Sequence, residues 1–154
     1  MLVHAAEQSF QKGMELLTIG RHREALAFFR GAIEIEKRTG GGPYQARYLS
    51  FFGLSVGLTD GGLHEAVRCC RQAAKQEGYR PEVCLNLGRV LLMADRRREA
   101  YRSLRAGLRM QPANREIHRE LRRMGRRRRP VVPFLGRQSP LNVFLGRLRS
   151  ATAR

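Results

Sequence analysis

A repeated spacing of small residues constrains the fold of this chain more than any other feature. In three places a glycine precedes, by twelve or thirteen residues, a stripe of small, large and small side chains at i, i+4 and i+7. On a helix such a stripe shares one face, and its small residues let a neighbouring helix approach closely. The first unit comprises Gly13, Ala25, Phe29 and Ala32; the second Gly53, Ala66, Cys70 and Ala73; the third Gly88, Ala100, Leu104 and Gly107.

The distance between equivalent positions predicts that each unit is a pair of helices. Ala66 and Ala100 lie 34 residues apart, whereas Ala25 and Ala66 lie 41 apart because the segment KRTGGGP (37–43) lengthens that connection. Gly or Asp in each intervening turn supplies a permissive backbone. Proline at position 112 cannot continue a helix interior. We therefore expect six helices, at about 4–18, 22–37, 44–58, 63–77, 81–94 and 97–110.

A seventh helix is predicted after Pro112. Asn114 is a suitable N-cap, and Ile117, Leu121 and Met124 form a narrow apolar stripe on an otherwise arginine-rich segment. A terminal helix with one apolar face is what a stacked array needs to close its exposed end. The predicted fold is thus an all-α helical-hairpin repeat of about seven helices over 4–125. An arm over 126–154 with one further short helix follows it.

The third unit carries the pattern of a known repeat motif. The segment LNLGRVLLMADRRREAYRSLRAGLRMQPAN (85–114) resembles the tetratricopeptide repeat (TPR) in its Leu87-Gly88 pair, Ala100 and closing Pro112. The first unit resembles it through Gly13, Gly20, Ala25, Phe29 and Ala32, while the second departs from it at Cys70 and Gly78. The resemblance covers about 5–114 and implies a right-handed superhelix. Each unit's first helix would line its concave face, and the protein would be a binding scaffold, although a fold specifies no ligand.

The resemblance also implies which side chains would line a groove for a partner. Positions that are Lys, Asn or Arg in relatives gripping a C-terminal carboxylate are here largely apolar, so we do not expect such a clamp. An apolar groove would instead bury an apolar peptide or helix; alternatively, these side chains pack between adjacent helices. The carried-over positions are Phe10, Met14, Leu17, Arg47, Phe51, Leu54, Leu58, Glu82, Leu85, Asn86, Arg89 and Leu92.

Positive charge is concentrated at the C-terminal end. Residues 115–154 carry 12 Lys and Arg against 2 Asp and Glu, or +10 of the total +17. Only three of the 30 basic residues are lysine, which reflects either codon composition or selection for bidentate contacts to phosphate or carboxylate. The run Arg126, Arg127, Arg128 and Arg129 is either a solvated linker or a contact for nucleic acid, an anionic membrane or an acidic protein.

The arm beyond this run is too apolar for a plain spacer. Ser139-Pro140 is typical of a helix start, but the helix that follows is too short to be stable alone in water. We expect the arm to dock on its own array, on a second copy to give a homodimer, or on another protein. Its apolar residues are Phe134, Leu135, Leu141, Phe144, Leu145 and Leu148.

No residue pattern indicates catalysis or a cofactor. Cys69, Cys70 and Cys84 form no CxxC pair, and the four histidines are scattered, so we expect free thiols and no metal site. We find no nucleophile triad, P-loop or HExxH motif, and expect no enzyme activity and no small-molecule substrate. Without a signal peptide or an apolar run of about 18–20 residues, a cytoplasmic location is expected.

Overall fold

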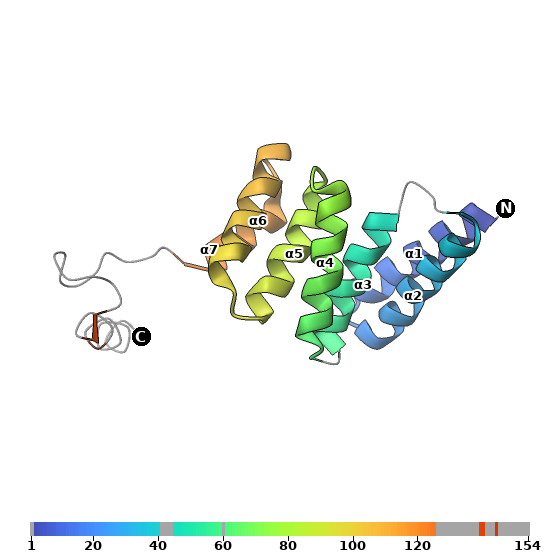
Figure 1. Cartoon of the computed structure of the whole chain (residues 1–154), viewed down its shortest axis with the longest axis horizontal. Coiled ribbons are helices and arrows are strands. Elements are labelled where there is room, and N and C mark those ends of the chain that lie inside the picture. The colour runs from blue at the N-terminus through green and yellow to red at the C-terminus, as the bar shows by residue number, and fades with distance from the viewer. Residues whose placement is uncertain (1, 41–44, 60, 126–138, 141–143, 145–154) are drawn as a thin grey trace. The chain divides into compact units, whose positions relative to one another are not determined.

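The computed structural model describes residues 2–40, 45–59, 61–125, 139–140 and 144. Across these residues it is helical without strands, which confirms the all-α prediction, and each predicted helix begins and ends within two residues of its expected bounds (Figure 1). The helices are α1 (Leu2–Thr18), α2 (His22–Arg38), α3 (Gln45–Thr59), α4 (Leu63–Glu77), α5 (Pro81–Met93), α6 (Arg97–Met110) and α7 (Arg115–Arg123).

Consecutive helices form hairpins that stack side by side (Figure 1). The pairs are α1 with α2, α3 with α4, and α5 with α6; α3 also packs against α2 and α5, and α7 closes the array against α5 and α6. The three turns inside the hairpins use a left-handed residue at the same place, Gly20 with φ +80°, Gly61 with φ +63° and Asp95 with φ +54°. Glycine and aspartate tolerate that conformation, which confirms the turns predicted from the sequence.

The small-to-large contact inside each hairpin repeats along the array. A Cβ atom placed on Gly13 would lie 2.6 Å from Phe29, one on Gly53 would lie 2.9 Å from Cys70 Sγ, and one on Gly88 would lie 2.6 Å from Leu104. In each hairpin, therefore, the large residue of the second helix packs against the glycine of the first helix. The same contact recurs at the closing end, where a Cβ on Gly107 would lie 2.7 Å from Ile117 of α7.

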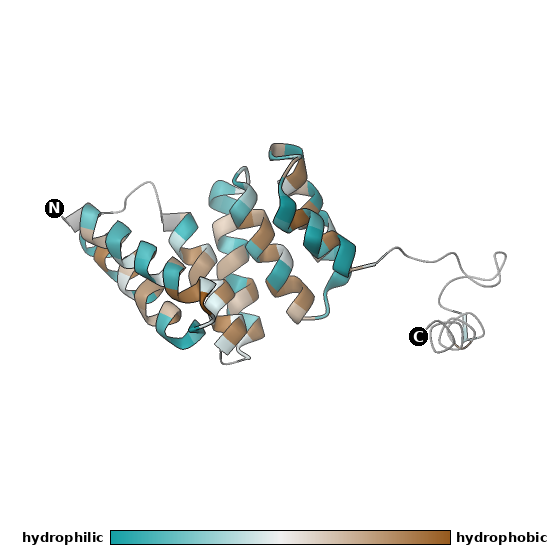
Figure 2. Ribbon diagram, turned by 180° about the vertical axis from the view of Figure 1, so that it is seen from behind, coloured by the Kyte–Doolittle hydropathy of each residue, from teal (hydrophilic) through white to brown (hydrophobic). Residues whose placement is uncertain are grey.

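Apolar residues gather between the helices, while hydrophilic residues dominate α6 and α7 (Figure 2). Between the first two hairpins the core is aromatic: Phe10 lies with its ring centroid 4.9 Å from that of Tyr48, 5.4 Å from Phe51 and 5.5 Å from Phe29. Between the second and third hairpins it is aliphatic, with buried residues such as Leu54, Val90 and Leu91. No helix in the described part of the chain is long and apolar enough to cross a bilayer.

Candidate functional site

The first helices of the three hairpins, α1, α3 and α5, carry the predicted partner residues, and we call their shared surface the first-helix face. Near the start of α1 and α3, polar and aromatic contacts join the two helices. Arg47 Nη1 lies 3.7 Å from Glu7 Oε1, and its guanidinium stacks 4.4 Å from the centroid of the Phe10 ring. Tyr48 donates a hydrogen bond of 2.9 Å to the other oxygen of Glu7. Arg47 is therefore engaged within the chain.

Burial and the bond to Glu7 together raise the pKa of Tyr48 well above its ordinary value. Because the neutral phenol is favoured, Tyr48 remains a donor to the Glu7 carboxylate across the whole neutral range. The Glu7 side chain thus connects to two residues of α3, and this contact fixes α1 against α3 at the charged end of the face.

Five predicted groove residues are core residues in the structure, which corrects their assignment to an open surface. Phe10, Phe51, Leu54, Leu85 and Asn86 expose between 0% and 8% of their surface. The aromatic pair belongs to the cluster between the first two hairpins, and Leu85 packs with α6 and α7. Neighbouring helices lie close on both sides of the stripe, so its middle positions are covered before any partner arrives.

Asn86 has a specific partner in the core. Its Nδ2 donates a hydrogen bond of 3.2 Å to Ser50 Oγ on α3, and both side chains are buried. A buried amide without such a partner would be destabilising. Asn86 therefore joins α5 to α3 and is not available to a peptide carboxylate.

The predicted positions that retain accessible apolar surface lie toward the ends of the first helices. Met14, Leu17 and Leu92 are half-buried, and Leu58 is 38% exposed. Met93, which the sequence analysis did not select, is 37% exposed, and its sulfur approaches Gly57 of α3. Met93 is the α5 residue equivalent to Leu58 of α3, and the glycine-based register could have identified it. We call these five residues the apolar row.

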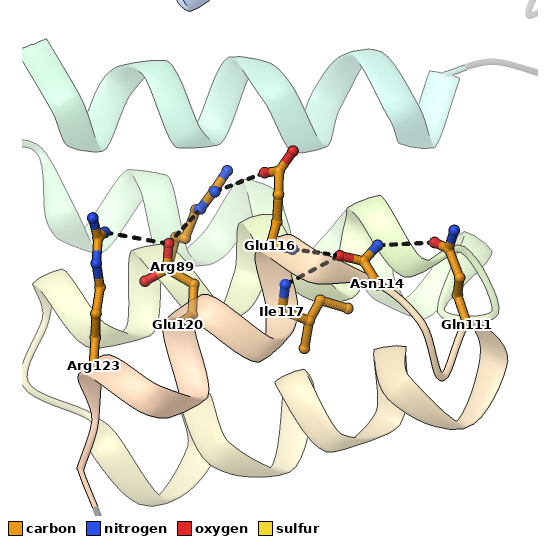
Figure 3. A network of polar contacts seen from close by, with 7 residues as sticks. All are labelled: Arg89, Gln111, Asn114, Glu116, Ile117, Glu120 and Arg123. Atoms are coloured by element: carbon orange, nitrogen blue, oxygen red, sulfur yellow. Dashed lines mark hydrogen bonds and ion pairs between the residues drawn. The ribbon is translucent and has the colours of Figure 1, made fainter.

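Arg89 is neutralised by the closing helix. Its Nη2 lies 2.8 Å from Glu116 Oε2, and its Nε lies 3.1 Å from Glu120 Oε1 (Figure 3). Glu120 is 7% exposed and also lies 3.7 Å from Arg123 Nη1. Glu116 and Glu120 are four residues apart and so share one side of α7. Arg89, whose position corresponds to a clamp residue of relatives that grip a carboxylate, is thus paired with carboxylates of its own chain.

The start of α7 explains why these carboxylates reach Arg89. Asn114 accepts hydrogen bonds from the backbone N–H groups of Glu116, at 3.1 Å, and Ile117, at 3.0 Å (Figure 3). Its own Nδ2 donates to Gln111 Oε1 at 2.8 Å. The predicted N-cap is therefore confirmed, and it fixes the rotation of α7 so that Ile117 faces Gly107 while the two glutamates face α5.

The last of the predicted positions, Glu82, is charged and paired. Glu82 lies 3.7 Å from Arg80, whose guanidinium also lies 2.6 Å from Glu77. Such half-exposed ion pairs contribute little to stability. They nevertheless leave the charged end of the first-helix face nearly neutral, so the apolar row is its distinguishing chemical feature.

The three cysteines are buried free thiols, as expected. Cys70 Sγ donates to the Ser50 carbonyl at 3.4 Å, and Cys84 Sγ donates to the Gly78 carbonyl at 3.3 Å. Burial raises the pKa of all three thiols, which keeps them protonated and unreactive near neutral pH. Among the described residues no group of three or more His, Cys, Asp or Glu side chains is arranged to hold a metal ion.

The predicted basic run and most of the predicted docking arm lie outside the described residues. These are 126–129, together with Phe134, Leu135, Leu141, Leu145 and Leu148. In the described remainder, Pro140 and Phe144 have helical backbone, and Phe144 is 61% exposed. Residues 125–154 form a unit separate from 1–124.

Comparison with known proteins places the fold. No family model and no curated protein sequence matches the chain. Among solved structures it is similar to the Arabidopsis OM64 TPR domain, with 19% identity over 80% of this chain and 97% of that one and a TM-score of 0.65. The first TPR domain of human RPAP3 is similar at 18% identity over 79% and 91%, with a TM-score of 0.65. The first TPR of Spaghetti (RPAP3), solved bound to the HSP90 peptide SRMEEVD, is similar at 18% identity over 77% and 89%, with a TM-score of 0.61.

Proposed function

Because the chain has the tetratricopeptide-repeat fold, we propose that it is a non-catalytic scaffold that binds a peptide or helix of another protein on its first-helix face. The similar structures support the general mode of action. The first TPR of Spaghetti (RPAP3) is bound to an HSP90 peptide, and a further similar structure, the second TPR domain of human RPAP3, is in complex with an HSP70 peptide. The proposal needs no cofactor and no chemical step by the chain itself.

The apolar row carries the more specific part of the proposal. It places half-buried or exposed aliphatic and methionine side chains at corresponding ends of three helices that run in the same direction. A fully exposed side chain of this kind gains ~1.5–3 kcal/mol on full burial and a half-buried one gains less, so several members of the row together would anchor a weak complex. Methionine adapts to irregular partners, which suits a surface for an apolar peptide.

An acidic C-terminal tail is a poor fit to this face. Arg47 is held by Glu7 and stacks on Phe10, and Arg89 is held by Glu116 and Glu120. A peptide carboxylate would have to displace these pairs, which removes an arginine from the half-buried Glu7 or from the buried Glu120. We therefore propose an apolar ligand and expect no saturable binding of the peptide SRMEEVD.

The experiment is a screen of short peptides against the full chain, followed by affinity measurements with three variants. Met93→Asp and Leu58→Asp should each weaken a selected peptide by about tenfold or more, because a charge replaces an apolar anchor. Met110→Asp is the matched control, since Met110 is 52% exposed on α6 and does not belong to the first-helix face. Equal losses in all three variants, or none, would remove the proposed site.

The C-terminal arm is a second element of the proposed scaffold. We propose that residues 134–148 dock through their apolar side chains, on the same chain or on a second copy. The six large apolar side chains of this segment support the proposal, because each gains ~1.5–3 kcal/mol on full burial. Hydrogen exchange of 134–148 at low and high protein concentration tests it: protection at both supports docking in the same chain, protection only at high concentration supports a homodimer, and none contradicts docking.

A further inference from the structure

We propose that the outer surface of α6 binds single-stranded nucleic acid, with a row of four arginines contacting consecutive phosphates and Tyr101 stacking on a base. The proposal concerns the folded array and is independent of the peptide site. It rests on the spacing of the arginines, on the ion pairs around them and on the exposed aromatic ring beside them.

The arginines form a single ladder along the helix. Arg98, Arg102, Arg105 and Arg109 are all exposed and follow one another at intervals of four, three and four residues. That spacing places them on one side of α6, opposite the buried stripe of Ala100, Leu104 and Gly107. Eleven residues of helix span about 16 Å. Neighbouring arginines therefore follow one another at a rise of about 4.5–6 Å along the helix, which gives a continuous basic track for a phosphate backbone.

These charges are not balanced inside the described parts of the chain. No ion pair there joins any of the four guanidinium groups to a carboxylate, because Glu99, the acidic residue of α6, contacts Arg71 and Arg96 instead. Like charges three and four residues apart repel one another on a helix. The ladder therefore weakens its own helix, and an anion bound along it would relieve that repulsion.

The equivalent helices of the other hairpins show that this charge is local. On the exposed surface of α2, Glu24 and Glu34 alternate with basic residues, and on α4 Arg68 lies 3.7 Å from Glu65. A general preference for arginine codons would enrich all three second helices alike. Among the three second helices, only α6 carries four exposed arginines on one side with no described ion pair to any of them, so their charge is available to an anionic ligand at this place.

Tyr101 makes a nucleic-acid strand a better fit than a lipid surface. Its side chain is 52% exposed, and it lies three residues after Arg98 and four before Arg105, within one helical turn of both. Single-strand binding combines a basic track with aromatic rings on which bases stack, whereas a membrane-bound helix needs a broad apolar side opposite its basic side. On α6 the side opposite the ladder is buried in the array.

The test is fluorescence anisotropy of the full chain with a labelled single strand of about 12 nucleotides. The variant R98Q/R102Q/R105Q/R109Q should lose affinity by at least about tenfold, and its log Kd should depend less steeply on log salt, by about 3, for four phosphate contacts at about 0.7 each. The control R23Q/K37Q/R38Q/K75Q removes the same charge from exposed positions of α2 and α4 that share no described ion pair. It should change affinity by less than about threefold, because distant charges are screened.

A second pair of variants tests the aromatic contact. Tyr101→Ala should weaken the strand by about tenfold through lost stacking, while Tyr79→Ala, which removes a tyrosine that is 60% exposed after α4, should leave it unchanged. Equal loss in the two charge variants would overturn the proposal. The proposal would also be overturned if only R126Q/R127Q/R128Q/R129Q abolished binding of the oligonucleotide. The same holds if the α6 variant weakened binding to vesicles containing phosphatidylserine and left binding of the oligonucleotide unchanged.

Discussion

The two ends of the helical array are held together by different interactions. At the α1–α3 end, four almost fully buried aromatic rings form four pairs with ring centroids 4.9–5.8 Å apart. At the α7 end, a nine-residue helix combines a buried isoleucine with ion pairs from Arg89 and Arg123. The same contact, a large side chain packed against a small residue of the neighbouring helix, occurs at both ends. The stability of each end therefore depends on the side chains around that contact.

This difference predicts where the array opens first. Aromatic burial is insensitive to salt, whereas half-exposed ion pairs weaken as salt is added. Hydrogen exchange in α7 should therefore be faster than in α1–α3 and should increase further with salt. The following variants sharpen or break this comparison.

The largest expected loss of stability comes from the aromatic end. Phe51→Ser, which removes a ring from the buried cluster and introduces a hydroxyl, should lower the free energy of unfolding by about 3–5 kcal/mol. Phe28→Ser on α2 is the matched control, because Phe28 is 38% exposed, and should cost much less. Urea titrations of the two variants provide the measurement. If Phe51→Ser unfolds no more easily than Phe28→Ser, Phe51 belongs to an accessible surface and its assignment to the core is wrong.

The next effect tests the close helix approach that the repeated small residues allow. Ala66→Leu and Ala100→Leu replace fully buried small residues, and overpacking at these positions should cost about 1–3 kcal/mol. Ala27→Leu, on the exposed side of α2, should stay within about 0.5 kcal/mol. Thermal melts of the three variants compare them directly. Leucine variants that match the parent would show that close helix contact is not required at those positions.

A smaller effect distinguishes the two carboxylates that hold Arg89. Glu120→Gln should cost about 1–2 kcal/mol because Glu120 is buried and contacts two arginines. Glu116→Gln should cost below about 0.5 kcal/mol, since the Glu116 side chain is 56% exposed. Hydrogen exchange of the α7 amides reports both. Equal protection in the two variants would mean that the Arg89 network does not hold α7 in place.

The smallest effect follows from the buried thiols. Burial raises the pKa of Cys70 and Cys84, so both remain protonated in the folded chain at a pH where an unfolded thiol ionises. Their contribution to stability is present below the unfolded pKa of about 8.5 and is lost as pH rises above it. The Cys70 thiol alone should lower stability by about 1 kcal/mol between pH 8 and 9.5, and this part of the decline should be lost in Cys70→Ala. An unchanged slope in that variant would contradict the buried assignment.

The repeat made the fold predictable, whereas the surface depended on tertiary contacts. Gly13, Gly53 and Gly88 determine which helix face meets the next helix, and this information is local to each unit. Whether Phe51 or Met93 remains accessible depends on how closely α1, α3 and α5 approach one another, which no single helix specifies. Likewise, the i, i+4 spacing of Glu116 and Glu120 was visible in the sequence. That they face Arg89 follows from the Asn114 cap and the Gly107–Ile117 contact.

The most direct test of the central proposal uses the methionine methyl groups as probes. Met14 and Met93 lie in the apolar row, Met110 lies on α6, and Met124 packs against the core beside α7. With 13C-methyl methionine in the full chain, titration of a selected apolar peptide should shift the Met93 and Met14 resonances and leave Met110 unchanged. Shifts at Met110 with none at Met93 or Met14 would place the partner elsewhere and contradict the account.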